Sequence, residues 1–105
     1  MSPPLLEQRA VGRKTPLDGR LELTPESAAR LGALGREFPV LAAGRAGLGR
    51  VETLECTCGK QAGAEPGERH THHFVASPLF RELTAGAPVR IELDDARGAL
   101  VVAPP

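Results

Sequence analysis

Apolar and polar residues alternate along several short stretches of this chain, which is the pattern of half-buried β-strands. The alternation is clearest in residues 88–93, where Val89, Ile91 and Leu93 fall on one face. The other stretches that read as strands are residues 20–23, 38–43, 50–58, 70–76 and 99–103. Residues 94–98 contain two aspartates and a glycine, which favour a hairpin turn between the last two strands.

Two short helices are expected between these strands, and both begin with the same device. Thr24 can cap a helix whose first position is Pro25, and Ser77 with Pro78 repeats this arrangement. Gly35 follows the first helix as a natural stop. The chain is therefore predicted to have an α+β fold, namely a small, mostly antiparallel β-sheet or barrel of about five to six short strands with two short helices.

Prolines and glycines lead to three further expectations. Pro39 cannot donate a backbone hydrogen bond, which favours an edge position for the strand over residues 38–43. Three glycines within residues 44–49 predict a turn there. Residues 1–18 contain three prolines and few apolar residues, so we expect a flexible N-terminal arm, followed by a single α+β domain over residues 19–105.

The composition limits the core that this domain can build. The chain of 105 residues has no Trp or Tyr and three Phe, so its core must be mostly aliphatic. Small domains of this kind often need a metal or a disulfide for stability. The net charge is zero, with 13 basic and 13 acidic residues, which argues against DNA binding by charge alone. No stretch approaches the roughly 20 apolar residues of a membrane span, and no secretory signal is recognised.

Two cysteines and two histidines are the candidate metal ligands. Cys56 and Cys58 form a C-T-C motif, and His70 and His72 begin an H-T-H-H motif after residues 59–69. Thiolate sulfur and imidazole nitrogen are the ligands of closed tetrahedral zinc sites. A disulfide between cysteines one residue apart would be strained, so reduced thiols and a cytoplasmic location are expected. The sequence therefore predicts zinc as the cofactor, bound by these four residues.

Strand alternation explains how the four residues would meet. Residues two apart in a strand share a face, so each pair of ligands points the same way. If residues 50–58 and 70–76 form an antiparallel hairpin, one register brings all four ligands to the loop end, with apolar residues toward the core. The pairs in that register are Cys58 with His70, Cys56 with His72, and Leu54 with Phe74. The metal-binding hairpin would then staple the sheet.

Three alternatives stay open for this segment. On a regular strand His73 points away from the metal, but a bulge would let it replace His72. The segment C-T-C-G-K could turn sharply at Gly59 as a knuckle, which keeps the same ligands and changes the register. The third alternative is a surface hairpin whose cysteines and histidines are incidental.

The segment from Pro66 to Phe74 (P-G-E-R-H-T-H-H-F) resembles the first metal motif of cupins, in which Pro-Gly precedes H-x-H on a barrel strand. The glutamate that follows in that family is absent, since residues 76–77 are Ala and Ser. The resemblance implies an open metal site on His70 and His72, with one or both cysteines replacing the missing ligands. Such a site would carry a metal-bound water and belong to a small metalloenzyme.

A second resemblance concerns residues 19–32 (G-R-L-E-L-T-P-E-S-A-A-R-L-G), which are similar to the strand-then-helix start of AbrB-type transition-state regulators. Residues 85–102 are similar to the strand pair that closes such folds. This resemblance implies a dimer that binds DNA through a basic strip. The residues available for phosphate contacts are Arg9, Arg13, Lys14 and Arg20.

Taken together, the residues predict a small zinc-stabilised binding module without catalytic activity. A metal held by four protein ligands has no open position for a substrate. The neutral net charge slightly favours a protein partner; a nucleic acid could dock on the N-terminal basic arm, a homodimer is compatible, and no membrane contact is expected. The alternative function is a cupin-like small metalloenzyme with an open His/Cys metal site.

Overall fold

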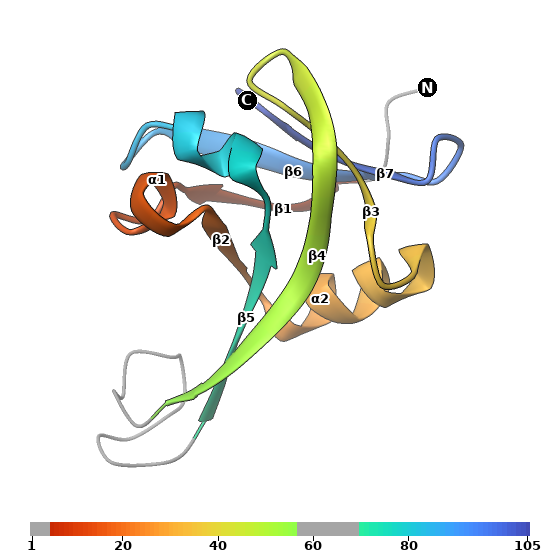
Figure 1. Cartoon of the computed structure of the whole chain (residues 1–105), viewed down its shortest axis with the longest axis horizontal. Helices are drawn as coiled ribbons and strands as arrows, with labels where there is room; N and C mark the ends of the chain where they lie inside the picture. The colour runs from red at the N-terminus through yellow and green to blue at the C-terminus, as the bar shows by residue number, and fades with distance from the viewer. Residues whose placement is uncertain (1–4, 57–69) are drawn as a thin grey trace.

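The computed structural model describes residues 5–56 and 70–105, with only the backbone of Cys56. Seven strands form one mixed sheet that curls into a half-barrel, accompanied by two short α-helices (Figure 1). The strands are β1 (Leu5–Ala10), β2 (Arg20–Leu23), β3 (Phe38–Ala42), β4 (Arg45–Cys56), β5 (His70–Ala76), β6 (Pro88–Asp94) and β7 (Ala99–Ala103). The α-helices are α1 (Thr15–Asp18) and α2 (Pro25–Leu31), and 3₁₀ turns cover Gly32–Leu34 and Pro78–Glu82.

The strand order is β1-β6-β7-β3-β4-β5-β2, and every neighbouring pair is antiparallel except β3 with β7. The predicted α+β class and mostly antiparallel sheet are therefore confirmed. The predicted caps are also present, because the Thr24 side chain accepts a hydrogen bond from Ser27 N and the Ser77 side chain accepts one from Leu79 N. Within the described residues, no helix is long and apolar enough to cross a membrane.

The N-terminal segment differs from the flexible arm predicted over residues 1–18. Residues 5–10 form β1, which pairs with β6 and adds a seventh strand. Val11 is only 3% exposed, and Thr15 at the start of α1 is buried as well. The pairing partner lies about 80 residues further along the chain, so local composition carries no signal of it.

Two expectations about β3 and β4 are wrong. Only Ala43 and Gly44 form the turn, both with positive φ, and the glycines at positions 47 and 49 lie inside β4. A Cβ at Gly49 would come within 2.6 Å of Val40 Cγ2, so the core itself requires a residue without a side chain there. Pro39 lies in an interior strand, and it is tolerated because the pairing of β3 with β7 spans only Val40 to Ala42.

The core lies on the inner face of the half-barrel. Its fully buried members include Leu21 from β2, Val75 from β5, Ile91 from β6 and Leu31 from α2. The core residues of the strands occupy alternate positions, so the polar residues between them face outward. Packing of this inner face fixes the register of β5 against both of its neighbours.

Side chains from β1 join the two edge strands of the half-barrel, and we call this contact the β1–β2 seam. Arg9 Nη1 donates to the backbone oxygen of Glu22 at 2.6 Å, and the Glu7 carboxylate accepts from Thr24 N at 3.0 Å and Ser27 Oγ at 2.7 Å. Arg9 also pairs with Glu7 at 3.1 Å. Within the described residues no backbone ladder joins β1 to β2. These side chains therefore replace the missing backbone bonds.

Glu7 is the acidic group that the seam perturbs most clearly. Its side chain is only 11% exposed, and this burial raises its pKa. Hydrogen bonds from Ser27 and Thr24, together with the Arg9 guanidinium, act in the opposite direction and outweigh burial. The pKa of Glu7 is consequently below its usual value of 4.5, and the carboxylate is held in its charged form.

Candidate metal-binding hairpin

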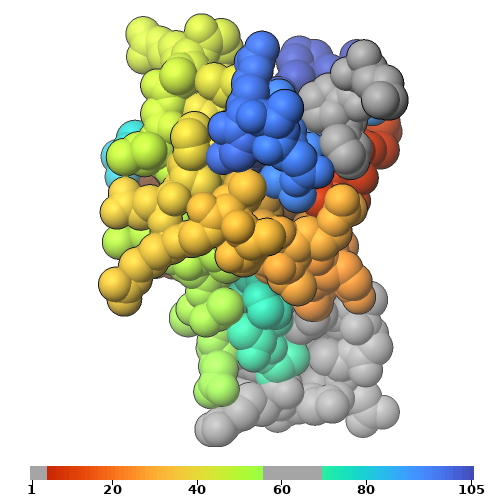
Figure 2. All heavy atoms as spheres, turned by 90° about the vertical axis from the view of Figure 1, so that its right-hand side faces the viewer, coloured from red at the N-terminus to blue at the C-terminus, as the bar shows by residue number. Residues whose placement is uncertain are grey.

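Of the candidate ligands, Cys56, His70 and His72 belong to the hairpin of β4 and β5, which extends away from the other strands (Figure 1). Figure 2 shows the end of this hairpin, in green and teal, reaching beyond the body of the sheet. The antiparallel pairing is confirmed. The predicted register is wrong by two residues, because Cys56 is opposite His70 and Leu54 is opposite His72.

The apolar residues on the inner face explain why β4 and β5 pair in the observed register. Val51 lies opposite Val75, and on the other side of β5 Leu21 lies opposite the same valine. Val75 and Leu21 are buried in the core. The predicted register would instead have placed Thr53 opposite Val75, so the ladder that pairs apolar with apolar residues prevails.

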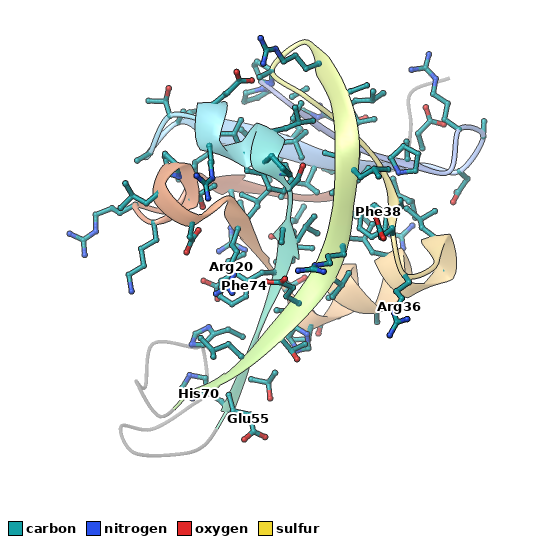
Figure 3. All side chains as sticks on the ribbon, viewed as in Figure 1. Arg20, Arg36, Phe38, Glu55, His70 and Phe74 are labelled. Atoms are coloured by element: carbon teal, nitrogen blue, oxygen red, sulfur yellow. The ribbon has the colours of Figure 1, made fainter. Side chains whose placement is uncertain are left out.

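His70 and His72 lie on the outer face of the hairpin, whereas the predicted register placed them next to residues that point toward the core. Leu54, which was expected to point toward the core, is 50% exposed. Phe74 is half-buried, and the Arg20 guanidinium lies 5.9 Å from its ring centroid. Figure 3 shows Arg20 beside Phe74, with His70 further along the same hairpin.

His70 and His72 come together as the alternation of β5 predicts. Their Nε2 atoms are 3.1 Å apart, and their ring centroids are 4.8 Å apart with the rings nearly perpendicular. The His72 side chain is 12% exposed. Two imidazole nitrogens therefore face each other at a partly sheltered point on the outer face.

Glu22 is a site residue that sequence reasoning missed. Its Oε2 atom lies 2.9 Å from Nδ1 of His72. Glu22 is opposite Phe74 in the β2–β5 ladder, which makes His72 its diagonal neighbour on the same face. Alternation in R-L-E-L places Glu22 outward, but only the pairing of β2 with β5 brings it to the histidine.

His73 lies on the other face of β5, opposite Leu23 and Thr53. His73 therefore points away from His72, and the β5 ladder runs from His70 to Ala76 without a bulge. The choice of His72 over His73 as metal ligand stays a prediction. His73 is therefore an internal control for the histidine pair.

The structure brings two of the four predicted ligands together. Cys58 lies outside the described residues, and of Cys56 only the backbone is described. Within residues 5–56 and 70–105, no group of three or more Cys, His, Asp or Glu side chains is arranged to hold a metal ion. The four-ligand zinc site thus stays a prediction.

A cleft of about 590 Å³ opens on the outer side of the sheet between α1, β4 and the Pro78–Glu82 turn. Arg20, Arg50 and Glu52 lie in its wall, and the Glu52 carboxylate bridges both arginines at 3.0 and 3.1 Å. Neither His70 nor His72 lines this cleft. This cleft and the histidine pair are therefore separate features.

The basic residues of the predicted arm are divided between two roles. Arg9 belongs to the β1–β2 seam, and Arg20 is paired with Glu52. Arg13 and Lys14 are exposed in the turn before α1. Two of the four residues proposed for a basic strip are therefore engaged in contacts within the domain.

The chain matches no protein-family model, and no curated protein or solved structure is significantly similar to it. The resemblances to cupins and to AbrB-type regulators consequently stay sequence-based predictions. Any function must be argued from the chain's own residues.

Proposed function

We propose that this protein is a small zinc-stabilised binding module, in which the β4–β5 hairpin binds the metal. The distance of 3.1 Å between Nε2 of His70 and Nε2 of His72 is the observation that carries this proposal. Two nitrogens bound at about 2.0–2.1 Å to one tetrahedral zinc ion lie roughly 3.3 Å apart. The spacing of the two nitrogens is thus within a few tenths of an ångström of what a zinc ion requires.

The cysteines would complete the site. Position 56 is opposite His70 in the ladder, which is the placement expected of residues that share one ion. Cys58 follows two residues later in the C-T-C motif. Soft thiolates combined with imidazoles favour zinc over hard cations. Reduced thiols are also consistent with the proposed cytoplasmic location.

A structural rather than catalytic role follows from the ligand count. Four protein ligands fill a tetrahedral zinc site and leave no position for substrate or water. The cleft described above is lined by residues other than His70 and His72. A cupin-like enzyme would need at least one open coordination position.

We favour a protein partner. The chain has no net charge, and two of the four arginine and lysine residues proposed for phosphate contacts are engaged within the domain. Leu48 and Leu54 are exposed on β4, whereas large apolar side chains are usually buried. A protein surface could cover both leucines.

The test is zinc content of protein purified without added metal, combined with zinc-edge X-ray absorption. We expect one zinc with two sulfur and two nitrogen neighbours. Zinc binding should be lost in His72→Ala and retained in the matched control His73→Ala. A water ligand in the first shell would favour the metalloenzyme, and equal binding by both variants would overturn the proposed site.

A further inference from the structure

Glu22 gives the histidine pair a defined arrangement of protons. We propose that Glu22 is a positioning residue that holds His72 as the Nδ1–H tautomer, so that Nε2 of His72 is the metal-binding atom. When zinc binds, it lies between the two Nε2 atoms, in the place of the proton through which His70 contacts His72. This inference rests on the proposed function, because it describes how the same site accepts its metal.

The first step concerns the contact between Glu22 and His72. A carboxylate can only accept a hydrogen bond, so at 2.9 Å the Nδ1 atom of His72 must be the donor. A neutral imidazole protonated at Nδ1 presents its lone pair at Nε2. Carboxylate–histidine pairs orient metal ligands in this way, because the carboxylate fixes both the tautomer and the ring plane.

The second step concerns His70. With both rings neutral, Nε2 of His72 is the acceptor, so the contact of 3.1 Å is a hydrogen bond in which Nε2 of His70 carries the proton and donates it. Zinc needs a lone pair on both nitrogens. Neutral His70 must therefore move its proton from Nε2 to Nδ1 when the metal binds. The proton stays on the same ring, so His70 itself releases none.

The third step concerns how Glu22 keeps a fixed position although its side chain is partly exposed. The Glu22 side chain is 43% exposed, but its backbone is held on both sides. It pairs with β5 opposite Phe74, and its carbonyl oxygen accepts from Arg9 at 2.6 Å. The neighbouring side chains Leu21 and Leu23 are buried in the core. The β1–β2 seam thus anchors the strand that presents Glu22 to His72.

Long-range ¹H–¹⁵N NMR of the histidine rings tests the assignment in the full chain, before and after addition of zinc chloride. In metal-free protein we expect His72 protonated at Nδ1 and His70 protonated at Nε2. After zinc addition both rings should carry the proton on Nδ1. A His72 ring protonated at Nε2 in the metal-free protein would overturn the inference.

Variants at Glu22 separate positioning from a general structural effect. Glu22→Ala should lose the preference of His72 for Nδ1–H and weaken zinc binding by about 10- to 100-fold. Glu22→Gln retains an accepting oxygen and should restore the tautomer. Glu52→Gln is the matched control, since Glu52 lies on the same face but pairs with arginines. Unchanged zinc affinity and tautomer in a folded Glu22→Ala protein would refute the role of Glu22.

The outcomes also distinguish this inference from the proposed function. A Glu22-dependent tautomer in a protein that binds no zinc would support the proton assignment and overturn the metal site. Zinc bound with two sulfur and two nitrogen ligands, but with an affinity independent of Glu22, would support the site and overturn the positioning role.

Discussion

Glu7 on β1 and Glu22 on β2 each join segments that are distant in the sequence, yet their carboxylates lie in different surroundings. Glu7 is nearly buried and accepts hydrogen bonds from Thr24, Ser27 and Arg9. Glu22 is close to half-exposed, and its carboxylate contacts Nδ1 of His72. The Glu7 carboxylate is surrounded by hydrogen-bond donors. The Glu22 carboxylate faces Nδ1 of His72, whose Nε2 atom in turn faces His70.

The difference separates a group that holds the fold from a group that sets up chemistry. A carboxylate saturated by donors gains its energy from the folded state itself, and removing it leaves those donors unsatisfied. A half-exposed carboxylate beside a histidine contributes little to folding, but it determines which imidazole nitrogen is available. We therefore expect stability to depend on the β1–β2 seam and metal binding to depend on Glu22.

Metal removal should have the largest effect on the hairpin. With zinc at a thousand times its dissociation constant, binding stabilises the folded state by about 4 kcal/mol. A strong chelator should remove this gain from wild type and from Glu7→Ala alike, as measured by urea unfolding. His72→Ala should show no gain, and His73→Ala should keep it. A chelator-insensitive unfolding curve in wild type would contradict the structural metal.

Glu7→Ala should give the next largest loss. The substitution leaves Thr24 N and the Ser27 hydroxyl without the Glu7 acceptor and removes the charge partner of Arg9, which should cost about 2–3 kcal/mol of unfolding free energy. Metal-free protein in urea is the right system, because it isolates the seam from zinc. A loss below that of an exposed glutamate such as Glu37→Ala would show that the seam does not hold the edge strands together.

The seam should also make stability depend on pH. The folded-state pKa of Glu7 is lowered from 4.5, so its ionised form stabilises the fold at pH values above 4.5. That contribution is lost as pH falls from 4.5 through the lower, folded-state pKa. The unfolding free energy of wild type minus that of Glu7→Gln should therefore be constant near neutrality and shrink in acid. A constant difference down to acidic pH would contradict the lowered pKa.

Sequence reasoning recovered the parts of the fold that depend on neighbouring residues. Alternation located β2, β5, β6 and β7, and the Thr24–Pro25 and Ser77–Pro78 pairs marked both helical turns. It also placed His70 and His72 on one face, because strand alternation needs no partner. Local sequence patterns are sufficient to predict a structural feature when that feature involves only neighbouring residues.

The rest depended on contacts that no local pattern contains. β1 is defined by its pairing with β6, the hairpin register by Val51 opposite Val75, and the role of Glu22 by β2 lying next to β5. Each of these contacts joins segments separated by tens of residues. The apolar pairs between β4 and β5 set a different register from the one that would align the four metal ligands, which is the register that the motif alone favoured.

Glu22→Gln should have the smallest effect on stability, and it is the sharpest test of the contrast with Glu7. In metal-free protein we expect the unfolding free energy to fall by less than about 1 kcal/mol, because a partly exposed pair contributes little to folding. Glu7→Gln should cost more, since the new amide presents donors to the Ser27 and Arg9 donors. Both variants make the same chemical change, so urea unfolding compares the two positions directly. Equal losses would mean that Glu22 also holds the fold, and its link to His72 would then be an ordinary structural contact.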